Sequence, residues 1–247
     1  MSWGTVWVIG ASFGIGQAFA ELCASHGMRV IASARTREPL EALAAADDRI
    51  VPLPFDVTDA EGVRAAVVEI EERQLLPDLT LYNAGFYEPV ESWRVDAALF
   101  RRHMEVNYMG AVQVLGDLLP PLVERGSGHV ALVASLSGYC GLPKAQAYGP
   151  SKAALISLCE SLKPETDAAG LTLSVVNPGF VATRLTDKNT FQMPYLMTPE
   201  DAARAMFDGL AAERFEVAFP GPLVRRLKTL RLLPYRVYFK LMNRLVA

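Results

Sequence analysis

Seven short apolar runs alternate with segments of helical spacing along the chain, and this alternation constrains the fold more than any other feature. The runs are almost continuously apolar, and they occupy residues 6–9, 29–33, 50–53, 79–82, 129–134, 171–176 and 215–219. Helix-start signals lie between them, such as Asp59 and the Thr198-Pro199-Glu200 stretch. Strands that alternate with helices need crossover connections, and strands apolar on both faces must be covered on both. We expect a doubly wound α/β fold with a seven-stranded, mostly parallel sheet.

Length and composition predict one globular domain. The chain has 247 residues, of which 51% are hydrophobic and 21% charged, values typical of a compact protein. We assign residues 1–222 to one α/β domain and residues 223–247 to a basic helical tail packed on it. Three cysteines without C-x-x-C spacing indicate neither disulfides nor a metal site. Without a signal-peptide pattern or an apolar run of membrane-spanning length, we expect a cytoplasmic protein.

A glycine cluster, GASFGIG at residues 10–16, separates the first apolar run from a helical segment that Gly27 can end. At such a junction Gly10 permits a tight turn, Gly14 lets the backbone approach a pyrophosphate, and Gly16 allows close packing of helix on strand. The free N–H groups of the helix then face the anion. A tight turn without a ligand is the alternative, but the position favours a Rossmann-type dinucleotide site.

Further motifs follow the glycines in a fixed order. They are Asp56 in FDVTD, the YNAG stretch at residues 82–85, Asn107, Ser135, the Tyr148-x-x-x-Lys152 pair and NPGFVAT at residues 177–183. Together with the G-x-x-x-G-x-G spacing, they resemble the classical short-chain dehydrogenase/reductase family over roughly residues 3–220. Two positions depart from the family pattern: Ile9 replaces a threonine and Tyr82 an asparagine.

The resemblance implies a bound nicotinamide dinucleotide. In the family the aspartate of the third strand meets the adenine amino group, and the P-G loop closes over the nicotinamide. Carried onto this sequence, the cofactor-binding residues are Gly10, Ser12, Phe13, Gly14, Ile15, Gly16, Arg35, Asp56, Val57, Asn83, Ala84, Gly85, Tyr148, Lys152, Pro178, Gly179, Val181 and Thr183.

Tyr148 and Lys152 are four residues apart on a predicted helix and therefore share one face. Tyrosine has a reference pKa of about 10, and we expect the lysine ammonium to lower it toward the working range. The resemblance implies that Ser135 holds the substrate oxygen, that Asn107 anchors a proton-relaying water and that Lys152 also binds the nicotinamide ribose. A solvated Tyr–Lys pair is the alternative, and Ser137 is the rival serine.

The cofactor preference is predicted from the end of the second apolar run, VIASAR. An acidic residue there would bind the ribose hydroxyls of NAD, whereas a basic residue accommodates the extra phosphate of NADP. Ala34 occupies the acidic position and Arg35 follows it. We therefore expect NADP(H) rather than NAD(H), with Arg37 either assisting or merely solvated.

The segment at residues 184–197 follows the P-G loop, where family members carry a mobile substrate lid. Its apolar side chains suggest a hydrophobic carbonyl or alcohol substrate, although ordinary packing explains them equally well; they are Phe191, Met193, Tyr195, Leu196 and Met197.

The tail carries a charge asymmetry. The net charge is −3, yet no Asp or Glu follows Glu216, whereas seven cations do: Arg225, Arg226, Lys228, Arg231, Arg236, Lys240 and Arg244. Leucines recur at helical spacing from Leu223, and beyond Pro234 an apolar face is predicted from Tyr235, Tyr238, Met242 and Leu245. Such a tail packs over the substrate mouth or a partner subunit, or it contacts an anionic membrane as a peripheral element. No nucleic-acid-binding motif is present.

These features predict an NADP(H)-dependent oxidoreductase that interconverts a hydrophobic ketone or aldehyde and its alcohol. The resemblance implies a homodimer or homotetramer. A membrane-associated reductase of a long-chain keto-lipid is one alternative. A nucleotide-sensing regulator without turnover is another, which the complete Ser-Tyr-Lys set disfavours.

Overall fold

Seven strands form one sheet in the computed structural model, which describes residues 3–189 and 191–244. Their order is β3-β2-β1-β4-β5-β6-β7, and every neighbouring pair is parallel. The strands are β1 (Thr5–Ile9), β2 (Arg29–Ser33), β3 (Ile50–Pro52), β4 (Leu79–Tyr82), β5 (His129–Val133), β6 (Thr172–Pro178) and β7 (Glu216–Phe219). Each lies within two residues of its predicted bounds, so the seven-stranded sheet is confirmed.

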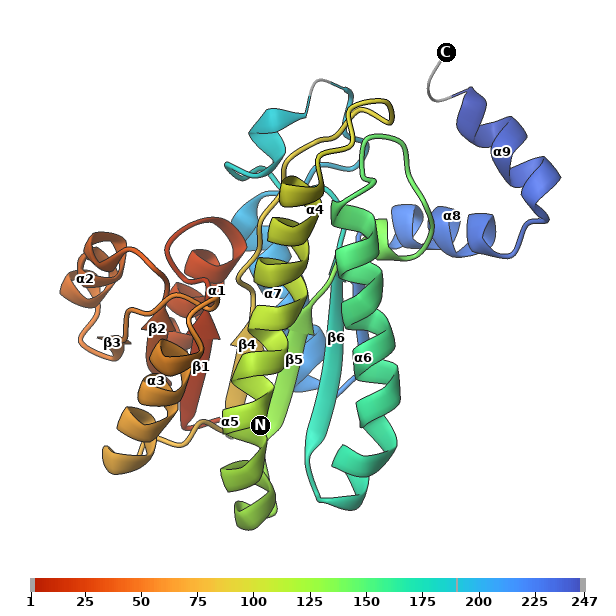
Figure 1. Ribbon diagram of the computed structural model, residues 1–247. Coiled ribbons are helices and arrows are strands. Elements are labelled where there is room, and N and C mark those ends of the chain that lie inside the picture. Colours follow the sequence, from red (N-terminus) through yellow and green to blue (C-terminus); the bar gives the residue numbers. More distant parts are fainter. Residues whose placement is uncertain (1–2, 190, 245–247) are drawn as a thin grey trace.

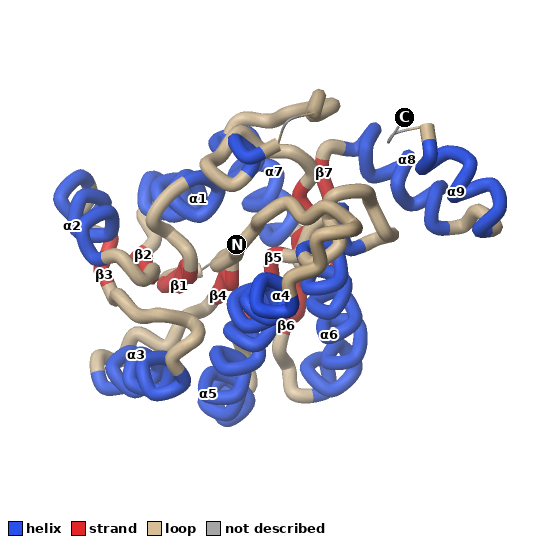
Figure 2. The backbone as a smooth tube through the Cα atoms, turned by 45° about the horizontal axis from the view of Figure 1, so that its top comes forward, coloured by secondary structure: helices blue, strands red, loops and turns tan. Residues whose placement is uncertain are grey.

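Helices cover both faces of the sheet (Figures 1 and 2). One face carries α1 (Gly14–Ser25), α2 (Arg37–Ala46) and α7 (Pro199–Ala211), and the other carries α3 (Ala60–Glu72), α5 (Gly110–Arg125) and α6 (Tyr148–Ala168). Two hydrophobic clusters fill the spaces between the sheet and these layers. The doubly wound single-domain fold is therefore confirmed.

Local signals set the helix ends. The Asp59 side chain accepts a hydrogen bond from the backbone N–H of Glu61 at the start of α3. The Thr198 hydroxyl accepts one from Asp201 at the start of α7, with Pro199 in the first turn. Gly27 has a positive φ of 84° just beyond α1, a conformation that glycine adopts at little cost.

The register brings the motif-bearing loops together. Ile9 of β1 is paired with Tyr82 of β4, so both strands end at the same edge. From β1 the chain turns to β2 on one side, while β4 lies on the other. Ligands of doubly wound folds bind at such a reversal, beyond the carboxyl ends of the strands.

Two helices, α8 (Gly221–Arg231) and α9 (Tyr235–Asn243), form the tail beyond the β7 edge (Figure 1). Tyr238 and Met242 of α9 are buried, but Tyr235, predicted on the same face, is exposed. The protein therefore covers only part of the predicted apolar face; Leu245 lies outside the described residues. No helix of residues 3–189 and 191–244 has the length and apolarity needed to cross a bilayer.

Candidate functional site

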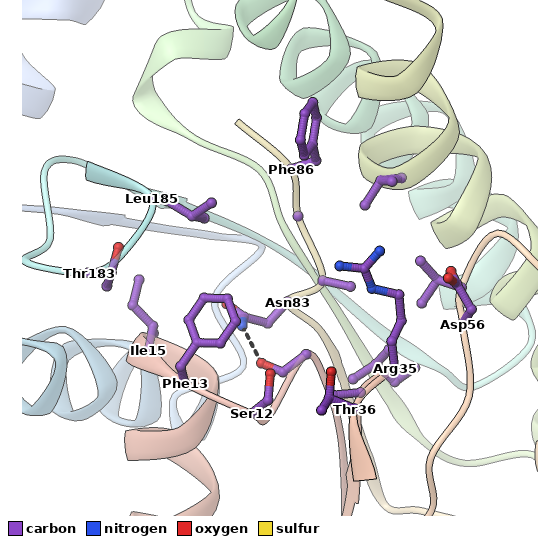
Figure 3. Close-up of a pocket in the computed structure, with 18 of the residues that line it drawn as sticks. Ser12, Phe13, Ile15, Arg35, Thr36, Asp56, Asn83, Phe86, Thr183 and Leu185 are labelled. Carbon is purple, nitrogen blue, oxygen red and sulfur yellow. Dashed lines mark hydrogen bonds between the residues drawn. The ribbon is translucent and has the colours of Figure 1, made fainter. Parts of the chain in front are cut away.

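A cleft opens at the carboxyl ends of β1, β2 and β4, above the glycine cluster (Figure 3). Gly10 and Gly14 have φ angles of +93° and +62°, which disfavour residues with a side chain. A Cβ at Gly10 would lie 2.6 Å from the Ala84 nitrogen, and one at Gly14 would lie 2.9 Å from Thr183 Cγ2. A Cβ at Gly16 would overlap the Gly10 carbonyl oxygen. Glycine at these three positions lets the loop pack closely against the β4 loop, Thr183 and α1.

Most of the predicted cofactor-binding residues line this cleft. They are Gly10, Ser12, Phe13, Gly14, Ile15, Arg35, Asp56, Val57, Asn83, Ala84, Gly85 and Thr183. Gly16 lies in the first turn of α1, behind the lining. Tyr148 and Lys152 lie beyond the cleft, in the catalytic group described below.

Of the four residues of the P-G loop that are predicted to bind the cofactor, Thr183 lines this cleft. Pro178 ends β6, where it is paired with Phe219. The backbone N–H of Gly179 donates to the Phe219 carbonyl, and Val181 is buried in a bridge with Met197. These three residues pack the loop against the protein, and their contact with the cofactor stays a prediction.

Further cleft residues lack a motif. Phe86 directly follows the YNAG stretch, a position that could have suggested it, but Arg102 and Leu185 have no sequence signal. The Arg102 guanidinium lies 4.4 Å from the centroid of the Phe86 ring, within the range of a cation–π contact. The other unpredicted lining residues are Ile9, Ala34, Thr36, Phe55 and Val106.

Arg35 extends its guanidinium into the cleft (Figure 3). Among the ion pairs of the described residues, none involves Arg35. Arg37, by contrast, is paired with Glu41 at 3.6 Å on an exposed side of α2. The nearby Asp56 carboxylate accepts hydrogen bonds from the Thr58 N–H and hydroxyl at 2.9 and 2.8 Å. Arg35 therefore leaves its donor fork available to an anion.

Tyr82 and Asn83 connect β4 to its surroundings. Asn83 Nδ2 donates to the Gly10 carbonyl at 2.9 Å and ties the β4 loop to the glycine cluster. The buried Tyr82 hydroxyl donates to the Val106 carbonyl at 2.6 Å, just before Asn107. The departure from the family pattern at Tyr82 thus gives β4 a hydrogen bond to the Asn107 segment.

The catalytic candidates meet beside the cleft. Ser135 follows β5, and its Oγ accepts a hydrogen bond from the Ser137 N–H at 3.1 Å. Tyr148 begins α6, and Lys152 lies one turn later with its Nζ 5.8 Å from the centroid of the Tyr148 ring. Lys152 Nζ donates to the Val133 carbonyl at 2.8 Å.

Burial moves the pKa values of this pair apart. The pKa of Tyr148 is raised to about 12 by burial, which outweighs the lowering effect of the Ser135 hydrogen bond. Burial lowers the pKa of Lys152 to about 7. The expectation that Lys152 lowers the Tyr148 pKa is therefore wrong for this structure, since loss of hydration dominates and the amine contacts Val133. At neutral pH Tyr148 holds its proton.

Asn107 lies in the π-helical turn Glu105–Met109 between α4 (Ala97–Met104) and α5. Its Nδ2 donates to the Phe86 carbonyl at 3.0 Å and to Ser151 Oγ at 2.9 Å, and its Oδ1 accepts from the Phe86 N–H at 2.6 Å. An amide has two N–H donors and an oxygen with two acceptor sites. One acceptor site on Oδ1 remains for the predicted water.

Tyr87 connects the catalytic tyrosine to the predicted lid. Its ring packs edge-on against Tyr148, with the centroids 5.1 Å apart, and its hydroxyl donates to Asn189 Oδ1 at 2.7 Å. Lys188 also donates to the Tyr87 carbonyl, at 3.1 Å, and is paired with Glu88. The first part of the 184–197 segment is thus held against the β4 loop. Phe191, Tyr195 and Leu196 are partly exposed, and their substrate-lining role remains a prediction.

Comparisons with known proteins agree with this geometry. The profile of the short chain dehydrogenase family matches residues 4–193. An uncharacterized oxidoreductase of Myxococcus xanthus is 35% identical over 238 residues, covering 95% of this chain and 94% of that protein. A short-chain dehydrogenase from Streptomyces avermitilis superposes with a TM-score of 0.85 and 28% sequence identity. The match covers 99% of this chain and 98% of that one. A short-chain dehydrogenase from Burkholderia cenocepacia, solved in complex with NADP, superposes with a TM-score of 0.84 and 25% sequence identity. This match covers 96% of this chain and 97% of that one.

The family profile spans more than half of the chain, and the Myxococcus relative is matched over nearly its whole length. The fold, the glycine cluster and the order of the motifs agree with these matches. The chain therefore belongs to the short-chain dehydrogenase/reductase family of oxidoreductases.

Proposed function

We propose that this protein is an NADP(H)-dependent oxidoreductase that interconverts a hydrophobic ketone or aldehyde and its alcohol. The observation that carries the proposal is the position of Tyr148, Ser135 and Lys152 beside a glycine-lined cleft that contains an unpaired Arg35. The NADP complex of the Burkholderia relative supports the choice of cofactor.

The cleft fits a dinucleotide by several criteria. Gly10 and Gly14 line the cleft with positive φ angles, so their backbone lies at its surface without side chains, which supports a backbone approach to a pyrophosphate. The N-terminus of α1 faces the same loop and favours an anion. Arg35 offers a planar set of donors suited to a phosphate on the adenosine ribose. When bound, the nicotinamide cofactor supplies or accepts the hydride.

Side chains of the protein donate the proton and bind the substrate oxygen. In the reductive direction Tyr148 Oη gives its proton to the carbonyl oxygen as the carbonyl carbon gains the hydride. Ser135 Oγ hydrogen-bonds that oxygen and stabilises the charge that develops on it. The raised pKa of Tyr148 keeps the phenol protonated at neutral pH, which is the form that can donate a proton to a carbonyl oxygen.

Arg35→Ala tests the cofactor assignment. Hydrogen bonds to charged groups contribute about 1.5–3 kcal/mol, so the NADPH dissociation constant should rise by roughly tenfold to 150-fold, with NADH affinity unchanged. Fluorescence titration of both reduced cofactors measures this. Arg37→Ala is the matched control, because Arg37 is already paired with Glu41. Equal loss of NADPH and NADH affinity in Arg35→Ala contradicts the assignment.

Turnover is tested with ketones and aldehydes graded by chain length, following NADPH oxidation. Oxidation that quickens as the chain lengthens supports a hydrophobic substrate. Tight NADPH binding without oxidation of any compound in the panel would instead favour the nucleotide-sensing regulator.

A further inference from the structure

The tail combines unpaired cations with exposed apolar side chains. In the described part of the tail, Lys228 is in an ion pair, with Glu216, whereas no ion pair involves Arg231, Arg236, Lys240 or Arg244. Since no carboxylate side chain follows Glu216, this end of the chain is uniformly positive, and the seven cations leave a net charge of −10 on the preceding residues.

Exposed apolar side chains lie at the end of α8 and on α9. Leu232, Tyr235 and Phe239 are 83%, 77% and 54% exposed, respectively. Tyr235 and Phe239 lie one helical turn apart and stack, with ring centroids 5.7 Å apart. Arg236 and Lys240 each follow one of these aromatic residues, so the next strip of the helix surface is basic.

Contacts of neighbouring residues hold α9 against the protein. The buried Tyr238 hydroxyl donates a hydrogen bond to the Gly141 carbonyl, and Met242 is also buried. Figures 1 and 2 both show α8 and α9 projecting beyond the β7 edge of the sheet. The aromatic and basic residues therefore lie on a projecting element whose inner side is already occupied.

We propose that this surface, formed by Leu232, Tyr235, Phe239, Arg236 and Lys240, binds the surface of an anionic lipid bilayer. Aromatic side chains beside cations are typical of helices that lie in the interface, where the rings enter the headgroup region and the cations meet anionic lipids. A bilayer accommodates a projecting helix, whereas a protein partner needs a surface of complementary shape.

The position of the tail gives this binding a consequence for the substrate. Tyr238 contacts Gly141, six residues after Ser135, and Tyr139 in the same segment hydrogen-bonds Glu216, the partner of Lys228. A bilayer on the tail would lie on the side of the molecule that carries the Ser135 segment. A membrane-bound protein could then receive a lipophilic carbonyl substrate directly from the bilayer. This consequence, unlike the binding itself, rests on the proposed function.

The test is co-sedimentation of the full chain with vesicles of phosphatidylcholine containing about 25% phosphatidylserine. Binding should fall at least about tenfold on pure phosphatidylcholine, and again in about 0.5 M salt, where charges are screened. Tyr235→Ser/Phe239→Ser and Arg236→Glu/Lys240→Glu should each weaken binding by about tenfold or more. The full chain is required because Leu223 and Leu227 of the tail belong to the hydrophobic core.

Matched controls lie elsewhere on the surface. Val68→Ser/Val123→Ser removes apolar side chains that are 44% and 49% exposed on α3 and α5. Arg64→Glu/Arg73→Glu makes the same change in net charge on α3. Both controls should bind vesicles like the wild type.

Three results would overturn the proposal: no vesicle binding, equal binding to neutral vesicles, or tail variants that bind as well as the controls. If the wild type does not bind vesicles and light scattering shows that the tail substitutions dissociate an oligomer, the surface binds a second copy of the chain instead. Vesicle binding without carbonyl reduction would refute the proposed function and leave the surface proposal intact.

Discussion

Tyr82→Phe removes one hydroxyl and tests how β4 supports the Asn107 segment. The hydroxyl lies fully inside the protein and donates to the Val106 carbonyl at 2.6 Å. It sits against Gly110, where a Cβ would overlap it. The substitution leaves a buried carbonyl without this donor, which costs about 1–3 kcal/mol. For a chain of this size each kcal/mol lowers Tm by about 2–4 °C, so a decrease of roughly 2–12 °C is expected.

Activity should change less than stability. Asn107 keeps its three hydrogen bonds to Phe86 and Ser151 in this variant, so kcat should fall by less than about tenfold. Thermal and denaturant unfolding measure the stability loss, and steady-state reduction measures kcat.

Two companion variants sharpen this test. Tyr235→Phe removes the same hydroxyl from an exposed side chain and should change stability by less than about 0.5 kcal/mol. Tyr82→Asn restores the residue typical of the family but leaves a cavity, and should cost about 3–5 kcal/mol, the range for large-to-small core changes. If Tyr82→Phe is as stable as the wild type, or Tyr82→Asn is more stable, the hydrogen bond to Val106 does not support this region.

Further predictions concern the catalytic group and the glycine cluster. Tyr148→Phe should abolish turnover and retain NADPH binding; activity within about tenfold of wild type, roughly 1.4 kcal/mol of barrier, would exclude Tyr148 as the proton donor. The kcat/KM for ketone reduction should stay constant from about pH 6 to pH 9. The rate of alcohol oxidation should rise over the same range, because only the Tyr148 phenolate accepts a proton. A tenfold fall in the kcat/KM for reduction over that range would indicate a lower Tyr148 pKa. Lys152→Met should abolish turnover and raise Tm. Below pH 7 the folded wild type bears the full free-energy cost of the buried Lys152 ammonium, and this cost fades as the pH rises from about 7 to 10.5. A gain in Tm that grows with pH would contradict this. Gly16→Ala should fail to fold or lose more than about 4 kcal/mol, measured by unfolding, since its Cβ overlaps the Gly10 carbonyl; wild-type stability would contradict the packing role of Gly16.

The order of the elements and most of the cleft could be predicted from the sequence. Local sequence patterns reveal the apolar strands, the helix caps such as Asp59 and Thr198, and the spaced glycines. Each of these features depends on residues that are close together in the sequence. Motif order then placed Arg35 and Asp56 in the cleft, where the structure has them.

Features that depend on neighbours distant in sequence could not be predicted, because they arise from the packing of the folded chain. Arg102 and Leu185 line the cleft because α4 and the loop after β6 meet there. The apolar residues of α9 divide between a buried and an exposed side because Gly141 accepts a hydrogen bond from Tyr238. The pKa of Tyr148 moved opposite to the expectation because burial is set by packing around the whole site, whereas spacing on a helix reports only that Lys152 is near.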